Sequence, residues 1–152
     1  MIISKKIMAA SFLIAAGYAG LASAHTQSGT VGLANSGLAK TDVYTVHCPA
    51  PATKLYLHVK DLAPVKLPVV SIQAIKGGSS PLSNDAVDGD AAYSPVATLA
   101  AGSGDYRLNV NKSAYTGTLA AHKGAEVYIA EFHCQDAGGN HTDTTWDMIQ
   151  DQ

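Results

Sequence analysis

Short segments in which apolar and polar residues alternate recur along the chain, and they restrict its possible folds more than any other feature. Successive side chains of a strand point to opposite faces, so this alternation indicates strands with one buried face. Clusters of Gly, Pro, Asn and Asp separate the segments, as turns do. The expected strands cover residues 26–34, 42–48, 54–60, 67–75, 105–110, 125–134 and 144–149.

The segment KLYLHVK at residues 54–60 illustrates how the faces are assigned. Its aliphatic residues Leu55, Leu57 and Val59 are expected to face a core, which leaves Tyr56 and His58 on the opposite, solvent-facing side. About seven strands joined by turns, without a capped helical stripe, predict an all-β fold. We expect one antiparallel β-sandwich or barrel, immunoglobulin-like or cupredoxin-like, with one disulfide.

Charge is sparse, and this excludes some functions. Only 14% of the 152 residues are charged, the net charge is −2, and Arg107 is the one arginine. A nucleic-acid-binding domain needs a basic face, so we expect no nucleic-acid partner. The 47% hydrophobic content is equally unlike a disordered chain.

Residues 1–24 are predicted to be a cleaved secretory signal peptide. Two lysines precede the apolar stretch 7–21, and an Ala-Ser-Ala cleavage site ends at Ala24. The alternative, a transmembrane anchor, would need about 20 apolar residues and no cleavage site. We therefore expect a periplasmic or secreted domain of residues 25–152, with no membrane span. Losing two lysines would change its net charge from −2 to about −4.

The two cysteines, Cys48 and Cys134, each end an expected strand. In an oxidising compartment such a pair usually forms a disulfide. The loop it would close is long, so the loop-entropy model gives a stabilisation of roughly 4 kcal/mol. The bridge resembles that of immunoglobulin domains, but the sequence leaves open whether it joins facing sheets or neighbouring strands.

A second interpretation makes Cys134 a metal ligand. The order Cys134, His141, Met148 resembles a stretched form of the cupredoxin copper loop. Two features oppose it: the second cysteine is available to oxidise the thiol, and Trp146 alternates with Met148 as core residues of a strand do.

Histidine provides the strongest chemical signal, because His25 would be the first residue of the exported chain. Its α-amino and ring nitrogens can then chelate one metal, and such nitrogen donors favour copper among divalent first-row ions. Further candidates are His47, His133 and His141. The first two each precede a cysteine, so they share a sheet face only if the cysteines lie on neighbouring strands.

An export signal, a β pattern and a mature N-terminal His25 resemble exported copper proteins of the CopC kind and histidine-brace monooxygenases. Both groups are β-sandwiches, and both complete the metal site with at least one further histidine. The resemblance implies a copper carrier, buffer or resistance factor with His25, His47, His133 and His141 as candidate ligands. We assign no catalytic residue. The rival hypothesis is a metal-free immunoglobulin-like structural or interaction domain.

An acidic loop at residues 84–90 adds one more candidate. Asp85, Asp88 and Asp90 offer oxygen ligands that suit Ca²⁺, but the spacing and terminal Glu of an EF-hand are absent. A plain acidic turn is the favoured interpretation.

Overall fold

The computed structural model describes residues 25–64 and 67–152, so the expected signal peptide lies outside the described residues. Within them, no helix has the length and apolar character needed to cross a membrane. The described elements are β1 (His25–Val31), β2 (Lys40–Cys48), β3 (Lys54–Leu62), β4 (Val70–Ile75), β5 (Leu82–Asn84), β6 (Ala97–Leu99), β7 (Gly104–Lys112), the 3₁₀ helix η1 (Ala120–His122), β8 (Glu126–Gln135) and β9 (Thr145–Gln150).

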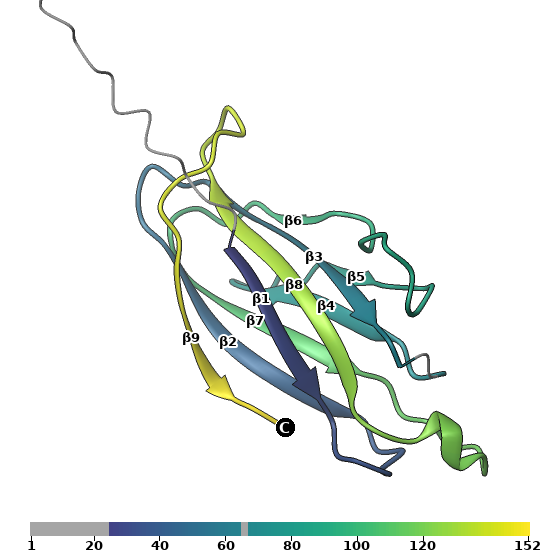
Figure 1. The fold of residues 1–152 in the computed structure, drawn as a ribbon. Coiled ribbons are helices and arrows are strands. Elements are labelled where there is room, and N and C mark those ends of the chain that lie inside the picture. The colour runs from purple at the N-terminus through teal and green to yellow at the C-terminus, as the bar shows by residue number, and fades with distance from the viewer. Residues whose placement is uncertain (1–24, 65–66) are drawn as a thin grey trace, which may run out of the picture.

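The strands form two antiparallel sheets that face one another (Figure 1). One has four strands in the order β1-β8-β3-β6, and the other has five in the order β5-β4-β7-β2-β9. The sheets do not close into a barrel, so the predicted sandwich with one disulfide is confirmed. Each of the seven expected strands is present. The sequence missed only β5 and β6, which have three residues each and are too short to show alternation.

The core fills the space between the sheets. Leu55, Leu57 and Val59 of β3 are fully buried, as their alternation predicts. At the β9 edge, the ring of Trp146 lies edge-on to Tyr44 of β2 and Phe132 of β8, with centroids 5.8 and 6.2 Å away. Both sheets therefore contribute to one continuous apolar layer.

The disulfide between Cys48 and Cys134 joins β2 of one sheet to β8 of the other. Of the two arrangements left open by the sequence, the cysteines thus adopt the one across facing sheets. The interpretation of Cys134 as a thiolate metal ligand is wrong, because its sulfur is bonded to Cys48. Since His47 and His133 each adjoin a cysteine, their side chains leave the sandwich on opposite outer faces.

We predict that replacing both cysteines by serine lowers the free energy of unfolding by about 4 kcal/mol, because the bridge closes a loop across 86 positions. Denaturant unfolding of the Cys48→Ser, Cys134→Ser variant would measure the loss. The reduced wild type is the control and should match the variant. A change below about 1 kcal/mol would contradict the assigned role.

Candidate metal site

The outer face of the four-stranded sheet gathers histidines from distant parts of the chain. In the β3–β8 ladder Tyr56 lies opposite His133, and His58 lies opposite Glu131. Opposed residues of antiparallel strands share a face, so all four side chains meet on this surface. With two residues from loops they form what we call the histidine patch: Tyr56, His58, Tyr93, Glu131, His133 and His141.

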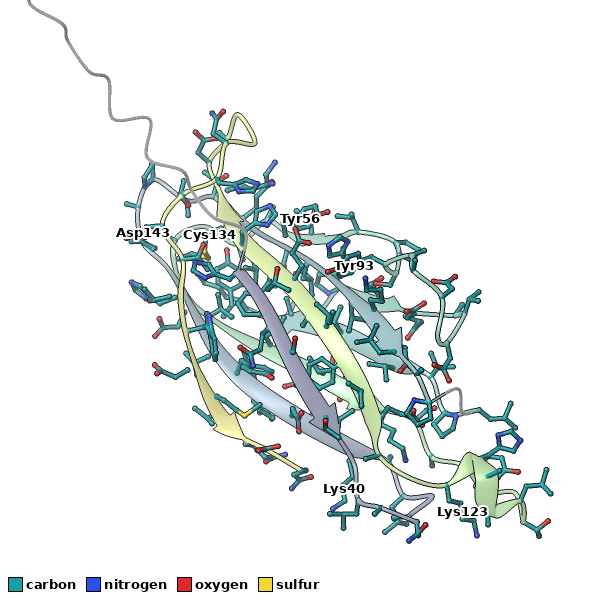
Figure 2. The ribbon with its side chains drawn as sticks, viewed as in Figure 1. Lys40, Tyr56, Tyr93, Lys123, Cys134 and Asp143 are labelled. Atoms are coloured by element: carbon teal, nitrogen blue, oxygen red, sulfur yellow. A yellow bond between two sulfur atoms is a disulfide. The ribbon has the colours of Figure 1, made fainter. Side chains whose placement is uncertain are left out.

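The rings of the patch form one continuous row. Tyr93 stacks on His58 with centroids 4.1 Å apart, and His58 meets Tyr56 edge-on at 5.2 Å. Tyr56 stacks on His133 at 4.3 Å, and the ring of His141 lies 3.8 Å beyond. Figure 2 shows Tyr56 and Tyr93 on this side of the sandwich. The stacking covers imidazoles that an isolated outer strand would expose, and the side chain of His58 is only 12% exposed.

Tyr93 reaches the patch because its loop docks on β3. Strand β6 pairs with β3 only between Leu55 and Leu57. Beyond it, the Ser94 amide donates to the Val59 carbonyl at 2.7 Å, and the Val59 amide donates to Ser94 Oγ at 3.0 Å. These bonds replace a strand neighbour and hold the ring of Tyr93 against His58.

His141 is held by the turn between β8 and β9. The Asp136 amide donates to the Asn140 carbonyl at 3.0 Å, and the Thr142 amide donates to the Cys134 carbonyl at 2.9 Å. An isolated bridge also pairs His141 with Gln135. The Gly-rich loop is therefore a hydrogen-bonded hairpin that brings His141 back over β8.

His25 begins β1, beside the end of β8 (Figure 1). Its pairing partner is Phe132, so His25 lies one position from His133. By strand alternation its side chain starts on the face of Phe132 rather than on the outer face. His25 is nevertheless close enough for its positive charge to lower the pKa of His133. An N-terminal amine there would lie at the edge of the histidine patch.

Burial and neighbouring charges keep His133 neutral. Its pKa is lowered to about 4, first by burial and next by the charge of His141. Glu131 opposes the shift, while His58 and His25 add to it. A neutral imidazole at physiological pH retains a lone pair, which a metal requires.

The ring nitrogens of His133 differ in their surroundings. Nε2 lies 3.0 Å from the side-chain amide nitrogen of Gln135, which donates to it and thereby assigns the proton to Nδ1. Rotating that amide by 180° would instead place an acceptor there and free the lone pair of Nδ1. Nδ1 is buried and has no hydrogen-bond partner among residues 25–64 and 67–152. A buried, unbonded imidazole nitrogen beside other imidazoles fits a metal ion.

His58 carries a second such nitrogen. Its Nε2 lies 3.1 Å from Glu131 Oε2, an ion-pair distance, but without hydrogen-bond geometry to any described residue. The alternation of residues 54–60 correctly predicts that His58 lies on the outer face, but it also predicts a solvent-facing side chain. It missed His58 as a site residue because the covering ring, Tyr93, is 35 positions away. No local pattern reports that contact.

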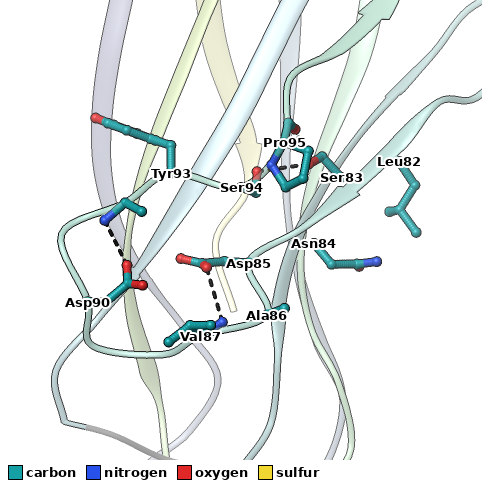
Figure 3. A pocket seen from close by; sticks show the side chains of 11 residues that line it. Leu82, Ser83, Asn84, Asp85, Ala86, Val87, Asp90, Tyr93, Ser94 and Pro95 are labelled. Carbon is teal, nitrogen blue, oxygen red and sulfur yellow. Dashed lines mark hydrogen bonds between the residues drawn. The ribbon is translucent and has the colours of Figure 1, made fainter.

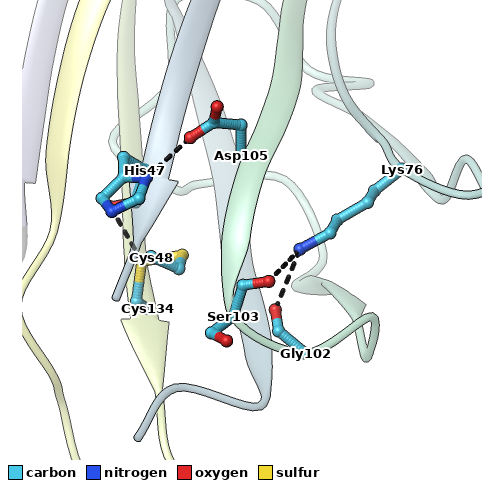
Figure 4. A network of polar contacts seen from close by, with 7 residues as sticks. All are labelled: His47, Cys48, Lys76, Gly102, Ser103, Asp105 and Cys134. Atoms are coloured by element: carbon cyan, nitrogen blue, oxygen red, sulfur yellow. Dashed lines mark hydrogen bonds and ion pairs between the residues drawn. A yellow bond between two sulfur atoms is a disulfide. The ribbon is translucent and has the colours of Figure 1, made fainter. Parts of the chain in front are cut away.

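His47 lies elsewhere. It stands on the outer face of the five-stranded sheet, where Nδ1 is 2.6 Å from Asp105 Oδ1 and the side chain is 52% exposed (Figure 4). In the same view Lys76 Nζ donates to the carbonyl oxygens of Gly102 and Ser103. The whole sandwich therefore separates His47 from the histidine patch, and it cannot bind the same ion as His133.

A pocket of about 460 Å³ lies beside the patch, between β5 and the loop that carries Tyr93 (Figure 3). Its carboxylates are engaged by backbone amides. Asp85 accepts from Asp61 and, at 3.4 Å, from Val87, and Asp90 accepts from Ala92 at 2.7 Å. These bonds maintain the loop, and we assign no chemistry to the pocket.

Comparison with known proteins gives no relative to argue from: no family model, curated protein or solved structure matches the chain. Function is therefore inferred from the geometry of the histidine patch.

The low pKa of His133 predicts a pH dependence of stability. At His133 the unfolded chain takes up a proton near pH 6.5 and the folded chain only near pH 4, so the contribution of His133 to the free energy of unfolding falls as pH decreases between these values. The full effect is roughly 3 kcal/mol. Asp61, whose pKa is raised to about 8, contributes with the opposite sign in every variant, so the loss should appear as the difference between the metal-free wild type and His133→Asn in denaturant unfolding from pH 7 to pH 4. His47→Asn, altered on the other sheet, should retain the wild-type slope. Equal slopes in all three proteins would contradict the assignment.

Proposed function

We propose that this protein is exported and binds one copper ion at the histidine patch, as a carrier, buffer or resistance factor. The observation that carries the proposal is the buried Nδ1 of His133, which has no hydrogen-bond partner among the described residues and offers a lone pair once the Gln135 amide is rotated, in a ring whose centroid lies 3.8 Å from that of His141. Imidazole nitrogen is a donor that copper prefers over the other divalent first-row metals. In this arrangement His133 is the central ligand and His141 its nearest companion.

The N-terminus would complete the site. This step rests on the expected cleavage after Ala24, which gives His25 a free α-amino group. Register brings the backbone of His25, and with it the amine, beside the end of β8, since His25 pairs with Phe132; the imidazole starts on the inner face and would have to turn around the edge of the sheet. Amine and imidazole nitrogens from one residue would then bind the ion beside His133. His58 lies on the far side of Tyr56 and is the remaining candidate.

The aromatic rings have a supporting part. Tyr56 stacks on His133, and Tyr93 stacks on His58, so each tyrosine fixes the plane of one imidazole. Groups that orient a metal ligand contribute measurably to affinity even though they do not touch the ion. We assign these tyrosines to positioning and propose no turnover.

We predict that His133→Ala weakens Cu²⁺ binding by at least about 100-fold. Loss of a residue that merely orients a ligand costs about 10–100-fold, so loss of a ligand should exceed that range. Isothermal titration of the metal-free exported protein with Cu²⁺ gives the affinity, and electron paramagnetic resonance reports the number of coordinating nitrogens. His141→Ala should also weaken binding and remove one nitrogen.

The matched control is His47→Ala, which removes a histidine from the opposite outer face. It should bind Cu²⁺ as the wild type does. A wild-type affinity in His133→Ala would remove the proposed site. If the wild type itself bound no Cu²⁺, the metal-free immunoglobulin-like domain would be favoured, because the inter-sheet disulfide suits that class equally well.

The role of the N-terminus has a separate test. We predict that one extra residue before His25 weakens Cu²⁺ binding strongly, because an amide nitrogen no longer offers the lone pair of an amine. Titration of the exported chain with and without an added N-terminal glycine measures the difference. Unchanged affinity would exclude the N-terminal amine while leaving His133 and His141 as ligands.

A further inference from the structure

A second cluster of ligand-type side chains lies at the other end of the β3–β8 ladder, and all its members are acidic. Asp61 stands near the end of β3, Glu126 begins β8, and Asp88 comes from the loop that follows β5. One carboxylate oxygen from each lies within 4.8 Å of the others. Asp61 and Glu126 are fully buried, whereas Asp88 is half-buried.

Strand alternation brings these carboxylates inside. Asp61 follows Leu55, Leu57 and Val59 on the inner face of β3, and Glu126 occupies the corresponding face of β8. The loop is fixed over them because the Gly89 amide donates to the Asp61 carbonyl oxygen at 3.2 Å. Two positions that face the core, Asp61 and Glu126, therefore carry acidic side chains, and a third acidic side chain, Asp88 from the loop, covers them.

Asp61 is the member of the cluster whose burial most requires a neutralising partner. It is completely inaccessible to solvent, yet neither carboxylate oxygen has a partner at hydrogen-bonding geometry among the described residues. Its pKa is raised to about 8, first by burial and then by Asp88, Glu126 and Asp85, while the nearby Val70 amide only partly opposes them. A buried carboxylate is costly unless a proton or a cation neutralises it.

We propose that Asp61, Asp88 and Glu126 bind a calcium ion. Carboxylate oxygens are the ligands of hard cations, and Ca²⁺ holds them at about 2.3–2.6 Å, so two ligands on opposite sides of the ion lie about 4.6–5.2 Å apart. The separations in the cluster are at most 4.8 Å and so do not exceed that span. Mg²⁺ dehydrates reluctantly and usually keeps several waters, so an enclosed group of protein carboxylates suits it less than Ca²⁺.

This site is independent of the proposed copper site. Asp61 is five residues from Tyr56 along β3, which corresponds to about 17 Å. One site offers oxygen ligands between the sheets, and the other offers nitrogen ligands on an outer face. Failure of either proposal leaves the other intact.

The test is titration of the chelator-treated exported protein with Ca²⁺ at pH 8.5, where Asp61 is ionised. We expect one bound ion and a melting temperature that rises by about 10 °C when free Ca²⁺ is 100 times the dissociation constant. Asp61→Asn, which keeps the shape and removes the charge, should abolish both effects. Asp147→Asn, exposed on β9, is the control and should behave as the wild type.

Asp61→Asn should also melt higher than the metal-free wild type at pH 8.5, because it removes a buried charge. If it fails to fold, Glu126→Gln provides the same test. Absence of Ca²⁺ binding by the wild type would overturn the proposal, as would wild-type affinity in the folded variants. Tighter binding of Mg²⁺ than of Ca²⁺ would overturn the choice of ion.

Discussion

The antiparallel pairing of β3 with β8 is the contact on which both sites depend. Its register sets Tyr56 opposite His133 on the outer face. The same two strands, read at their other ends, direct Asp61 and Glu126 inward. Because side chains of a strand alternate with a period of two, a slip of one residue would exchange the faces and dismantle both clusters at once. The apolar residues between them, which must remain buried, fix that register.

The disulfide decides which histidines can act together. By joining β2 to β8 it bridges facing sheets, so the residues that precede its two cysteines leave the sandwich in opposite directions. His47 consequently lies beside Asp105 on the far face, while His133 packs among other rings. The disulfide brings the Cα atoms of Cys48 and Cys134 to 5.5 Å. The side chains of the preceding residues, His47 and His133, nevertheless lie on opposite outer faces.

Much of the architecture could be predicted, and much of the site could not. Alternation in residues 54–60 correctly assigned Leu57 to the core and His58 to the outer face. It could not reveal that Tyr93 would cover His58, because that contact comes from a loop hydrogen-bonded to β3. The acidic loop was predicted to be a turn, and Asp88 does lie in a turn, but the sequence could not show that this turn brings Asp88 to carboxylates from two strands.

The sequence alone determined an all-β fold, a sandwich or a barrel, together with the inward and outward faces of its strands and part of the set of potential ligands. These properties depend on residues close together in the chain, where the period of a strand is visible. Only the tertiary structure decided which ligands meet, because pairing, loop docking and the packing of one sheet on the other are long-range contacts. The sequence predicted His133 as a ligand, and the fold supplied its neighbours and its neutral state.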